Sequence, residues 1–203
     1  MATSSLDIKY LKDPDVRLML RVRDGDENAF SQLVQNYQDR IVGIFSHILG
    51  DHEAAEDLAQ ETFLRVYRTR RGYQPNAKFS TYIFHIANNL ASNTRRKKNR
   101  RKEVAMPAGQ TTAFGVRPEE ALAVEKSALM PARQLTREEL RAQVRESLEA
   151  LSDREKTAIL LHKFEGMSYV DISTAMDMTE PAVKSLLART REKLRVILEP
   201  LIR

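Results

Sequence analysis

The chain has 203 residues, 42% hydrophobic and 30% charged, which suits one large or two small globular domains rich in helix. It has no cysteine, which excludes disulfides, thiolate metal sites and thiol nucleophiles, and no two of its four histidines are spaced as ligands on one helix. A signal-peptide pattern and an apolar run of about 20 residues are both missing. We therefore expect a cytoplasmic protein without direct membrane insertion, metal or cofactor.

The positive charge of the chain is concentrated in one run. The net charge is +5 and the isoelectric point is about 9.5. Residues 95–102 read RRKKNRRK, seven positive charges in eight positions, so the rest of the chain carries −2. Such a focused patch favours a polyanionic partner, with nucleic acid first among them. The alternatives are a solvated helix end or a tract like a nuclear-localisation signal.

Apolar residues recur at every third or fourth position, which predicts helices throughout. A first helix is expected to begin after Asp13 as its cap, with Pro14 in the first turn, and to end at Gly25. A second helix carries its apolar face through 29–48 and is expected to end at Gly50.

A third helix is expected to begin at Asp51 and to bury apolar residues between 58 and 67. The loop RRGYQPNAK follows, and a fourth helix is expected from about Phe79 to Arg101. Together the four helices predict a bundle within an N-terminal domain over 1–102.

Regular apolar spacing is lost after residue 102. Residues 103–117, EVAMPAGQTTAFGVR, predict the start of a flexible linker over 103–135, within which PEEALAVEKSALM is compatible with a short helix. A C-terminal domain is expected over 136–203. Its helix starts are marked by capping-box patterns. These patterns are TREE at 136–139, SDRE at 152–155 and SYVD at 168–171.

The last two expected helices of this domain form a helix-turn-helix pattern. Ser168 caps the first of them and Thr179 the second, and MDMT turns the chain between them. Val183, Leu187, Thr190 and Leu194 make the buried stripe of the last helix. Its opposite side carries Lys184, Ser185, Ala188, Arg189, Arg191 and Arg195. Such a helix fits the major groove of DNA. A plain helical hairpin with solvated charges is the alternative.

Four stretches resemble the extracytoplasmic-function (ECF) sigma factors of bacterial RNA polymerase, in the order that the family has them. GDENAFSQLVQNYQDRIVGIF and AEDLAQETFLRVYR resemble region two, and KFSTYIFHIANNLASNTRRKKNRR resembles its promoter-melting segment. LSDREKTAILLHKFEGMSYVDISTAMDMTEPAVKSLLARTREKLR resembles region four. The terminal PLIR is similar to the sigma-E-like subgroup. The resemblance implies an all-α protein with an N-terminal helical bundle and a C-terminal helix-turn-helix domain joined by a flexible linker.

The resemblance also implies a polymerase-binding surface on the third helix. An outward stripe there includes a leucine among acids and amides, a mixture that suits a protein interface. The residues that match the family motif for binding core polymerase are Asp57, Gln60 and Glu61, and the same outward stripe includes Leu64 and Arg68. An ordinary solvated face is the alternative.

The fourth helix resembles the segment that reads and melts the minus-10 element. Amide side chains can read a base edge, and a basic helix end can hold phosphates. The residues expected there are Phe84, Asn89, Asn93, Arg95 and Arg96. By resemblance, Phe84 and the loop Tyr73–Lys78 wall a pocket for an extruded base. A place in the core is the simpler interpretation of Tyr82, and it competes with the pocket at Phe84.

The last helix resembles the family's reader of the minus-35 element. Lysine, arginine and serine can bond guanine edges or phosphates. The matching positions are Lys184, Ser185, Arg189 and Arg191. Leu186 departs from the arginine that many relatives have, so a DNA contact is missing there, or the leucine touches a thymine methyl group or another protein.

The function implied is that of an alternative sigma factor with core RNA polymerase and promoter DNA as partners, an anti-sigma factor as its inhibitor, and no catalytic centre. One rival is a stand-alone helix-turn-helix regulator, which would need no polymerase-binding stripe. A second rival is a helical adaptor protein, which would not explain the basic run. An enzyme is disfavoured because the sequence has no nucleophile–base arrangement, metal cluster or glycine-rich phosphate loop.

Overall fold

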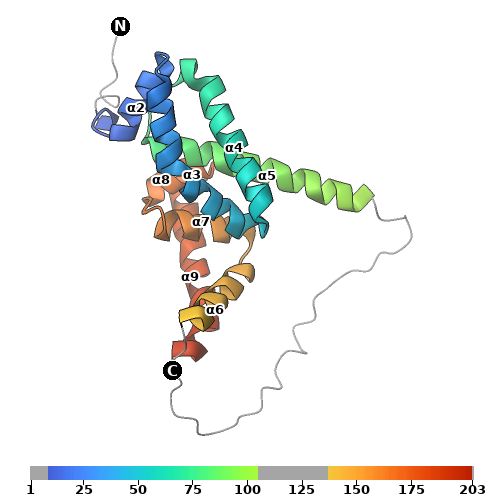
Figure 1. Cartoon of the computed structure of the whole chain (residues 1–203). Coiled ribbons are helices and arrows are strands. Elements are labelled where there is room, and N and C mark those ends of the chain that lie inside the picture. The colour runs from blue at the N-terminus through green and yellow to red at the C-terminus, as the bar shows by residue number, and fades with distance from the viewer. Residues whose placement is uncertain (1–8, 105–136, 203) are drawn as a thin grey trace, which may run out of the picture.

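The computed structural model describes residues 9–104 and 137–202, and the regular structure in these two ranges is helical (Figure 1). The elements are α2 (Pro14–Arg23), α3 (Glu27–Leu49), α4 (His52–Thr69), the 3-10 turn η1 (Arg70–Gly72), α5 (Phe79–Val104), α6 (Arg137–Glu149), α7 (Asp153–Lys163), α8 (Tyr169–Ala175) and α9 (Glu180–Ile202). The predicted all-α class is confirmed. We call α2–α5 the N-terminal bundle and α6–α9 the C-terminal domain.

The helices of the bundle begin where the sequence supplies a cap. Asp13, Asp26 and Asp51 each accept a hydrogen bond from a backbone N–H of the first turn of α2, α3 and α4, at 2.9, 3.0 and 3.2 Å. These bonds satisfy donors that a helix start otherwise leaves unpaired. Gly50 ends α3 with a φ of 69°, a left-handed conformation that glycine adopts without strain.

Aromatic residues fill the centre of the bundle. Tyr37 of α3 packs edge-on against Phe79 and Phe84 of α5, with ring centroids 5.1 and 6.4 Å apart. All three side chains are at most 2% exposed. The Tyr37 hydroxyl donates to Asp15 of α2 at 2.7 Å, so the same side chain ties a third helix to the core. This packing fixes the direction of α5, whose C-terminal half extends away from the bundle (Figure 1).

The C-terminal domain is built around α7. Seven consecutive residues of this helix, 155–161, are buried. A helix buried all round must be enclosed by neighbours, and α7 packs against α8 and α9 of its own domain and α3 of the bundle. The capping pattern at 152–155 is confirmed, since Glu155 Oε2 accepts from the Ser152 backbone N–H at 2.9 Å. The pattern at 168–171 is confirmed by the bond from the Asp171 N–H to Ser168 Oγ at 3.1 Å.

The two domains pack directly against each other, which the sequence did not predict. Helix α8 lies on α5, and α7 lies on α3. Arg40 of α3 forms an ion pair with Glu165, which follows α7, with Nε 2.8 Å from Oε2. Lys78 and Thr81, beside and in the first turn of α5, donate to Asp171 of α8 at 3.3 and 3.1 Å.

Some expectations fall outside the described residues. These are the linker from residue 105 onward, the short helix at 118–130 and the capping role of Thr136. Helix α5 continues to Val104, past the expected boundary at 102. Over the ranges 9–104 and 137–202, no helix combines the length and apolarity that crossing a membrane requires.

Candidate nucleic-acid and protein interfaces

Helix α4 presents the predicted mixed stripe to solvent. Asp57 and Gln60 are exposed, Glu61 is partly exposed, and Leu64 keeps 47% of its surface accessible. Beside the stripe, α3 and α4 leave a groove of about 530 Å³ lined by Gln60, Leu64 and a row of apolar side chains. The apolar lining is Phe30, Val34, Val42, Ala59 and Phe63. Sequence reasoning identified the stripe but missed this groove, because the α3 residues were assigned to the inward face.

Phe84 does not line a base pocket, contrary to its predicted role at the minus-10 element. It is 2% exposed and lies between the Tyr37 ring and the Arg40 guanidinium, which is 5.9 Å from the Phe84 ring centre. The side chain is part of the bundle core. Tyr82, which was expected in the core, packs against its edge: the side chain is partly exposed, its ring centroid lies 6.1 Å from that of Phe79, and its hydroxyl lies 3.0 Å from Thr69 Oγ1.

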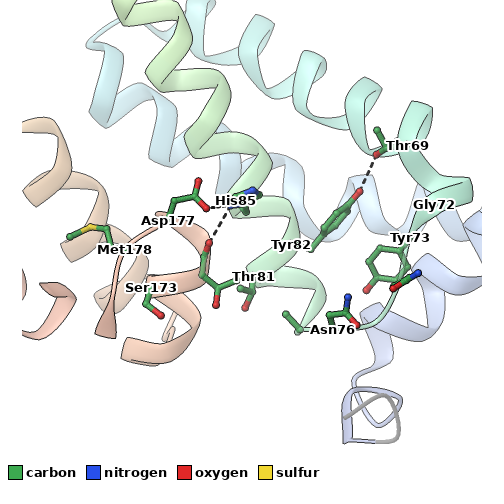
Figure 2. Close-up of a pocket in the computed structure, with 13 residues that line it drawn as sticks. Thr69, Gly72, Tyr73, Asn76, Thr81, Tyr82, His85, Ser173, Asp177 and Met178 are labelled. Atoms are coloured by element: carbon green, nitrogen blue, oxygen red, sulfur yellow. Dashed lines mark hydrogen bonds and ion pairs between the residues drawn. The ribbon is translucent and has the colours of Figure 1, made fainter. Parts of the chain in front are cut away.

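A pocket of about 690 Å³ lies next to Tyr82 (Figure 2). One side is formed by the loop after η1 together with Tyr82 and His85, and the other by Ser173, Asp177 and their neighbours. Figure 2 shows the side chains of both domains facing this space. Tyr73, Gln74, Asn76 and Ala77 of the loop at 73–78 line this pocket, and residues of α8 and the following turn complete it. That the pocket receives a base stays a prediction.

Tyr73 contributes a buried polar atom to this region. It is 5% exposed, its ring packs edge-on against Tyr82 at 5.0 Å, and its hydroxyl has no hydrogen-bond partner among the described residues. Burial raises the pKa of this hydroxyl, and the nearby Asp13 carboxylate raises it further, so it stays protonated. A buried phenol hydroxyl without a partner can still donate a hydrogen bond to a polar group that reaches it.

The predicted amide residue Asn89 is partly buried and bonded to His85, one helical turn earlier, with Nδ2 3.1 Å from Nε2. His85 Nδ1 lies 3.2 Å from the Thr174 carbonyl oxygen. Both contacts are satisfied when Nε2 accepts from Asn89 and Nδ1–H donates to Thr174. Sequence reasoning missed His85, although its i, i+4 spacing from Asn89 was visible.

The exposed end of α5 carries the remaining predicted minus-10 residues. Asn93 and Arg96 are exposed. The side chain of Arg95 lies outside the described residues, as do those of the basic positions 97–102. This half of the helix extends away from the rest of the bundle (Figure 1).

Helix α9 separates a buried face from an exposed donor face, as predicted. Val183, Leu187 and Thr190 are fully buried. Lys184, Ser185, Arg189 and Arg191 are exposed on the other side. Arg191 Nη2 donates to the Tyr169 hydroxyl at 2.6 Å, so its guanidinium is held against α8.

Leu186 belongs to the core and not to a contact surface. It is 8% exposed, and its carbonyl oxygen accepts a hydrogen bond from Thr190 Oγ1 at 2.8 Å. The expected contacts with a thymine methyl group or another protein are therefore wrong for this structure. Both Leu186 and Leu187 are buried because α9 packs against α6, α7 and α8.

Comparison with known proteins identifies two matching family models. The model described as Sigma-70 region 2 matches residues 33–101, and the model described as Sigma-70, region 4 matches residues 141–194. The part of the chain that the structure describes contains no group of three or more histidine, aspartate or glutamate side chains placed to hold a metal ion.

Relatives match over nearly their whole length. The RNA polymerase sigma-H factor of Pseudomonas aeruginosa is 34% identical over 192 residues, covering 95% of this chain and 97% of the relative. The ECF RNA polymerase sigma-E factor of Escherichia coli is 31% identical over 189 residues, with 93% and 96% coverage. The fold is similar to that of CnrH in its complex with the cytosolic domain of CnrY, with a TM-score of 0.64, 20% identity, and 93% and 99% coverage.

Proposed function

The chain belongs to the ECF sigma factors of bacterial RNA polymerase, and we propose that three of its helices each make one contact. These contacts are with core polymerase, the minus-10 element and the minus-35 element. The protein is an alternative sigma factor that directs promoter-specific transcription, with core polymerase and promoter DNA as its partners. One observation carries this assignment. Helix α4 exposes a leucine among polar side chains, which suits a protein partner, whereas α9 exposes a face of hydrogen-bond donors, which suits DNA.

We propose that α4 binds core polymerase. Leu64 is the apolar centre of the contact, Asp57 and Gln60 supply polar bonds around it, and the neighbouring groove can receive an apolar side chain of the partner. An apolar centre with a polar rim is the usual anatomy of a protein interface. A stand-alone DNA-binding regulator would not need this surface, and it is not favoured.

We propose that α5 and the loop before it read and melt the minus-10 element. The amide of Asn89 is placed to bond a base edge once His85 releases it, and Asn93 and Arg96 continue the polar face along the helix. Tyr82 and the loop at 73–78, in place of Phe84, wall the pocket for an extruded base. Capturing that base stabilises the melted state relative to the duplex, so binding free energy drives opening.

We propose that α9 enters the major groove of the minus-35 element. Lys184, Ser185 and Arg189 are exposed, and no side chain in the part of the chain that the structure describes binds them, while Arg191 is hydrogen-bonded to Tyr169. The buried stripe opposite them fixes the helix orientation, so the donors approach the groove as a rigid set.

The chemistry of transcription then belongs to the polymerase, and we assign this chain no catalytic step of its own. We place it in the cytoplasm, where polymerase and promoter DNA are found. We also propose regulation by an anti-sigma factor, since a solved sigma factor of similar fold, RpoE of Bartonella quintana, was crystallised with the anti-sigma factor NepR.

Run-off transcription with the cognate core polymerase on a promoter library tests this function. We expect transcription start sites that appear only when the chain is present and that share two promoter elements. Leu64→Asp should weaken core binding by about tenfold or more, because it places a charge in the apolar centre. Val144→Asp is the matched control, since Val144 is also an exposed apolar helix residue, 38% accessible on α6. No new starts and no core binding by the folded wild type would overturn the proposal.

A further inference from the structure

We propose that a pocket between the end of α3 and helices α6 and α7 binds a small molecule that carries a phosphate group. The pocket has a volume of about 570 Å³, and none of its residues belongs to the three contact faces proposed above, so the inference does not rest on the proposed function. Three basic side chains from three different helices carry it. They are His47 of α3, Arg145 of α6 and Lys156 of α7.

Lys156 supplies a positive charge that water screens little. The residue is 8% exposed and belongs to the stretch of α7 that is buried on all sides. Attraction between opposite charges is stronger where the surroundings are less polar, so a buried ammonium group attracts an anion more strongly than one at the surface. Because α7 is the central helix of its domain, packing also fixes the place of this charge.

Arg145 supplies hydrogen-bond donors that the protein does not use itself. Its side chain is exposed, and no residue within the described ranges 9–104 and 137–202 forms a hydrogen bond or ion pair with it. A guanidinium group can donate two parallel hydrogen bonds to a phosphate, which makes arginine a preferred residue for phosphate recognition. The pocket therefore joins a buried positive charge to an accessible one.

The electrostatics of His47 indicate that the three basic groups lie near one another. Burial lowers the pKa of His47 below its usual value, and the charges of Arg145 and Lys156 lower it further. The imidazole is therefore mostly neutral at pH 7, and its N–H group can donate a hydrogen bond. Arg145 and Lys156 remain as neighbouring like charges, whose repulsion a bound anion would reduce.

Two carboxylates also line the pocket, and they restrict the kind of anion that fits. Asp51 caps α4 by accepting the Ala54 backbone N–H at 3.2 Å, and Glu149 is exposed. Both repel an anion, so a ligand with a single negative charge gains little from this site. A phosphate group carries about 1.5 to 2 negative charges at pH 7 and has three acceptor oxygens, so it can bind several donors at once.

The rest of the lining can receive a ligand larger than inorganic phosphate. Ile48, Leu49 and Leu148 place apolar side chains in the same pocket as the donors. A pocket of several hundred cubic ångströms that combines apolar walls with a few polar groups is the usual form of a small-molecule site. Pyrophosphate and a nucleoside diphosphate share the phosphate chemistry that the basic groups recognise, and measured affinities can separate them.

Isothermal titration calorimetry of the full-length chain at constant ionic strength tests the site, with pyrophosphate and ADP as probes. Arg145→Ala should weaken binding of both probes about tenfold or more, because it removes charge-assisted hydrogen bonds. Arg154→Ala is the matched control, since Arg154 is an exposed arginine of α7 that does not line the pocket, and it should leave both affinities unchanged. Tighter binding of ADP than of pyrophosphate would support the proposal and show that the apolar lining holds the nucleoside.

The proton NMR signals of His47 provide a local readout that separates this site from the basic run at 95–102. A phosphate bound in the pocket should raise the pKa of His47, because it offsets the charges of Arg145 and Lys156. His47→Gln identifies the signals among those of the four histidines.

Three results would overturn the proposal. The first is an absence of binding by the wild-type chain, and the second is equal affinity in Arg145→Ala and wild type. The third is a weaker affinity of Arg145→Ala for random-sequence duplex DNA with no loss of pyrophosphate binding, which would assign the arginine to the DNA backbone. Run-off transcription measures the proposed function separately, and Arg145→Ala should retain it because the residue lies off the three contact faces.

Discussion

Glu155 is predicted to join the recognition helix α9 to the rest of the C-terminal domain through its charge. Its Oε1 receives the Lys193 ammonium of α9 at 2.7 Å, and its Oε2 receives the Ser152 hydroxyl at 2.7 Å and backbone N–H at 2.9 Å. The carboxylate side chain is 8% exposed, whereas that of Lys193 is 53% exposed. Glu155→Gln keeps the shape but removes the charge, so it isolates the electrostatic part of this junction.

The size of the effect follows from the pKa of Glu155. The Lys193 ammonium, together with the Ser152 donors, outweighs the effect of burial and lowers the pKa from 4.5 to about 2. At about 1.4 kcal/mol per pKa unit, this difference corresponds to roughly 3 kcal/mol. Because Lys193 is half-exposed and water screens its charge, we expect Glu155→Gln to lower the free energy of unfolding by about 1–3 kcal/mol at pH 7.

The pH dependence has a defined sign. The folded-state pKa is depressed, so the stabilisation is fully present above pH 4.5 and is lost as the pH falls toward 2. Urea unfolding followed by far-UV circular dichroism should show a gap between wild type and Glu155→Gln that closes over this range. Glu192→Gln, which removes an exposed carboxylate paired with Arg195, should have little effect at any pH. A gap of equal size at pH 7 and pH 3 would refute the electrostatic explanation.

Three further outcomes are expected. Lys184→Ala and Arg189→Ala should each weaken use of the minus-35 element by about 1–3 kcal/mol per base contact, measured as promoter affinity of the holoenzyme; full retention by both would exclude α9 as the reader. Asn89→Ala should leave duplex binding intact but reduce promoter opening, and normal permanganate reactivity near minus-10 would contradict its role. Leu186→Ala should cost about 2–4 kcal/mol of stability in urea unfolding because the side chain is buried; an unchanged free energy would place Leu186 outside the core.

The helices could be predicted from sequence because their determinants are local. Asp13, Asp51 and Ser168 mark the starts of α2, α4 and α8 by bonding backbone groups two or three residues away. The buried stripe of α9 follows from a regular spacing that needs no knowledge of the partner helices. The same spacing also predicts which face of a helix stays exposed, and α4 and α9 expose the faces that were predicted.

The positions that were wrong depend on contacts between distant segments. Ile83 and Phe84 are adjacent in sequence and both buried, because α5 packs against more than one neighbour. The same holds for Leu186 and Leu187 on α9. The helical spacing of apolar residues identifies only one buried face of each helix. Phe84 and Leu186 lie beside that face in sequence, so Phe84 was assigned to a base pocket and Leu186 to the exposed side. The placement of α8 on α5, which completes the pocket beside Tyr82, involves residues about ninety positions apart and has no local signal.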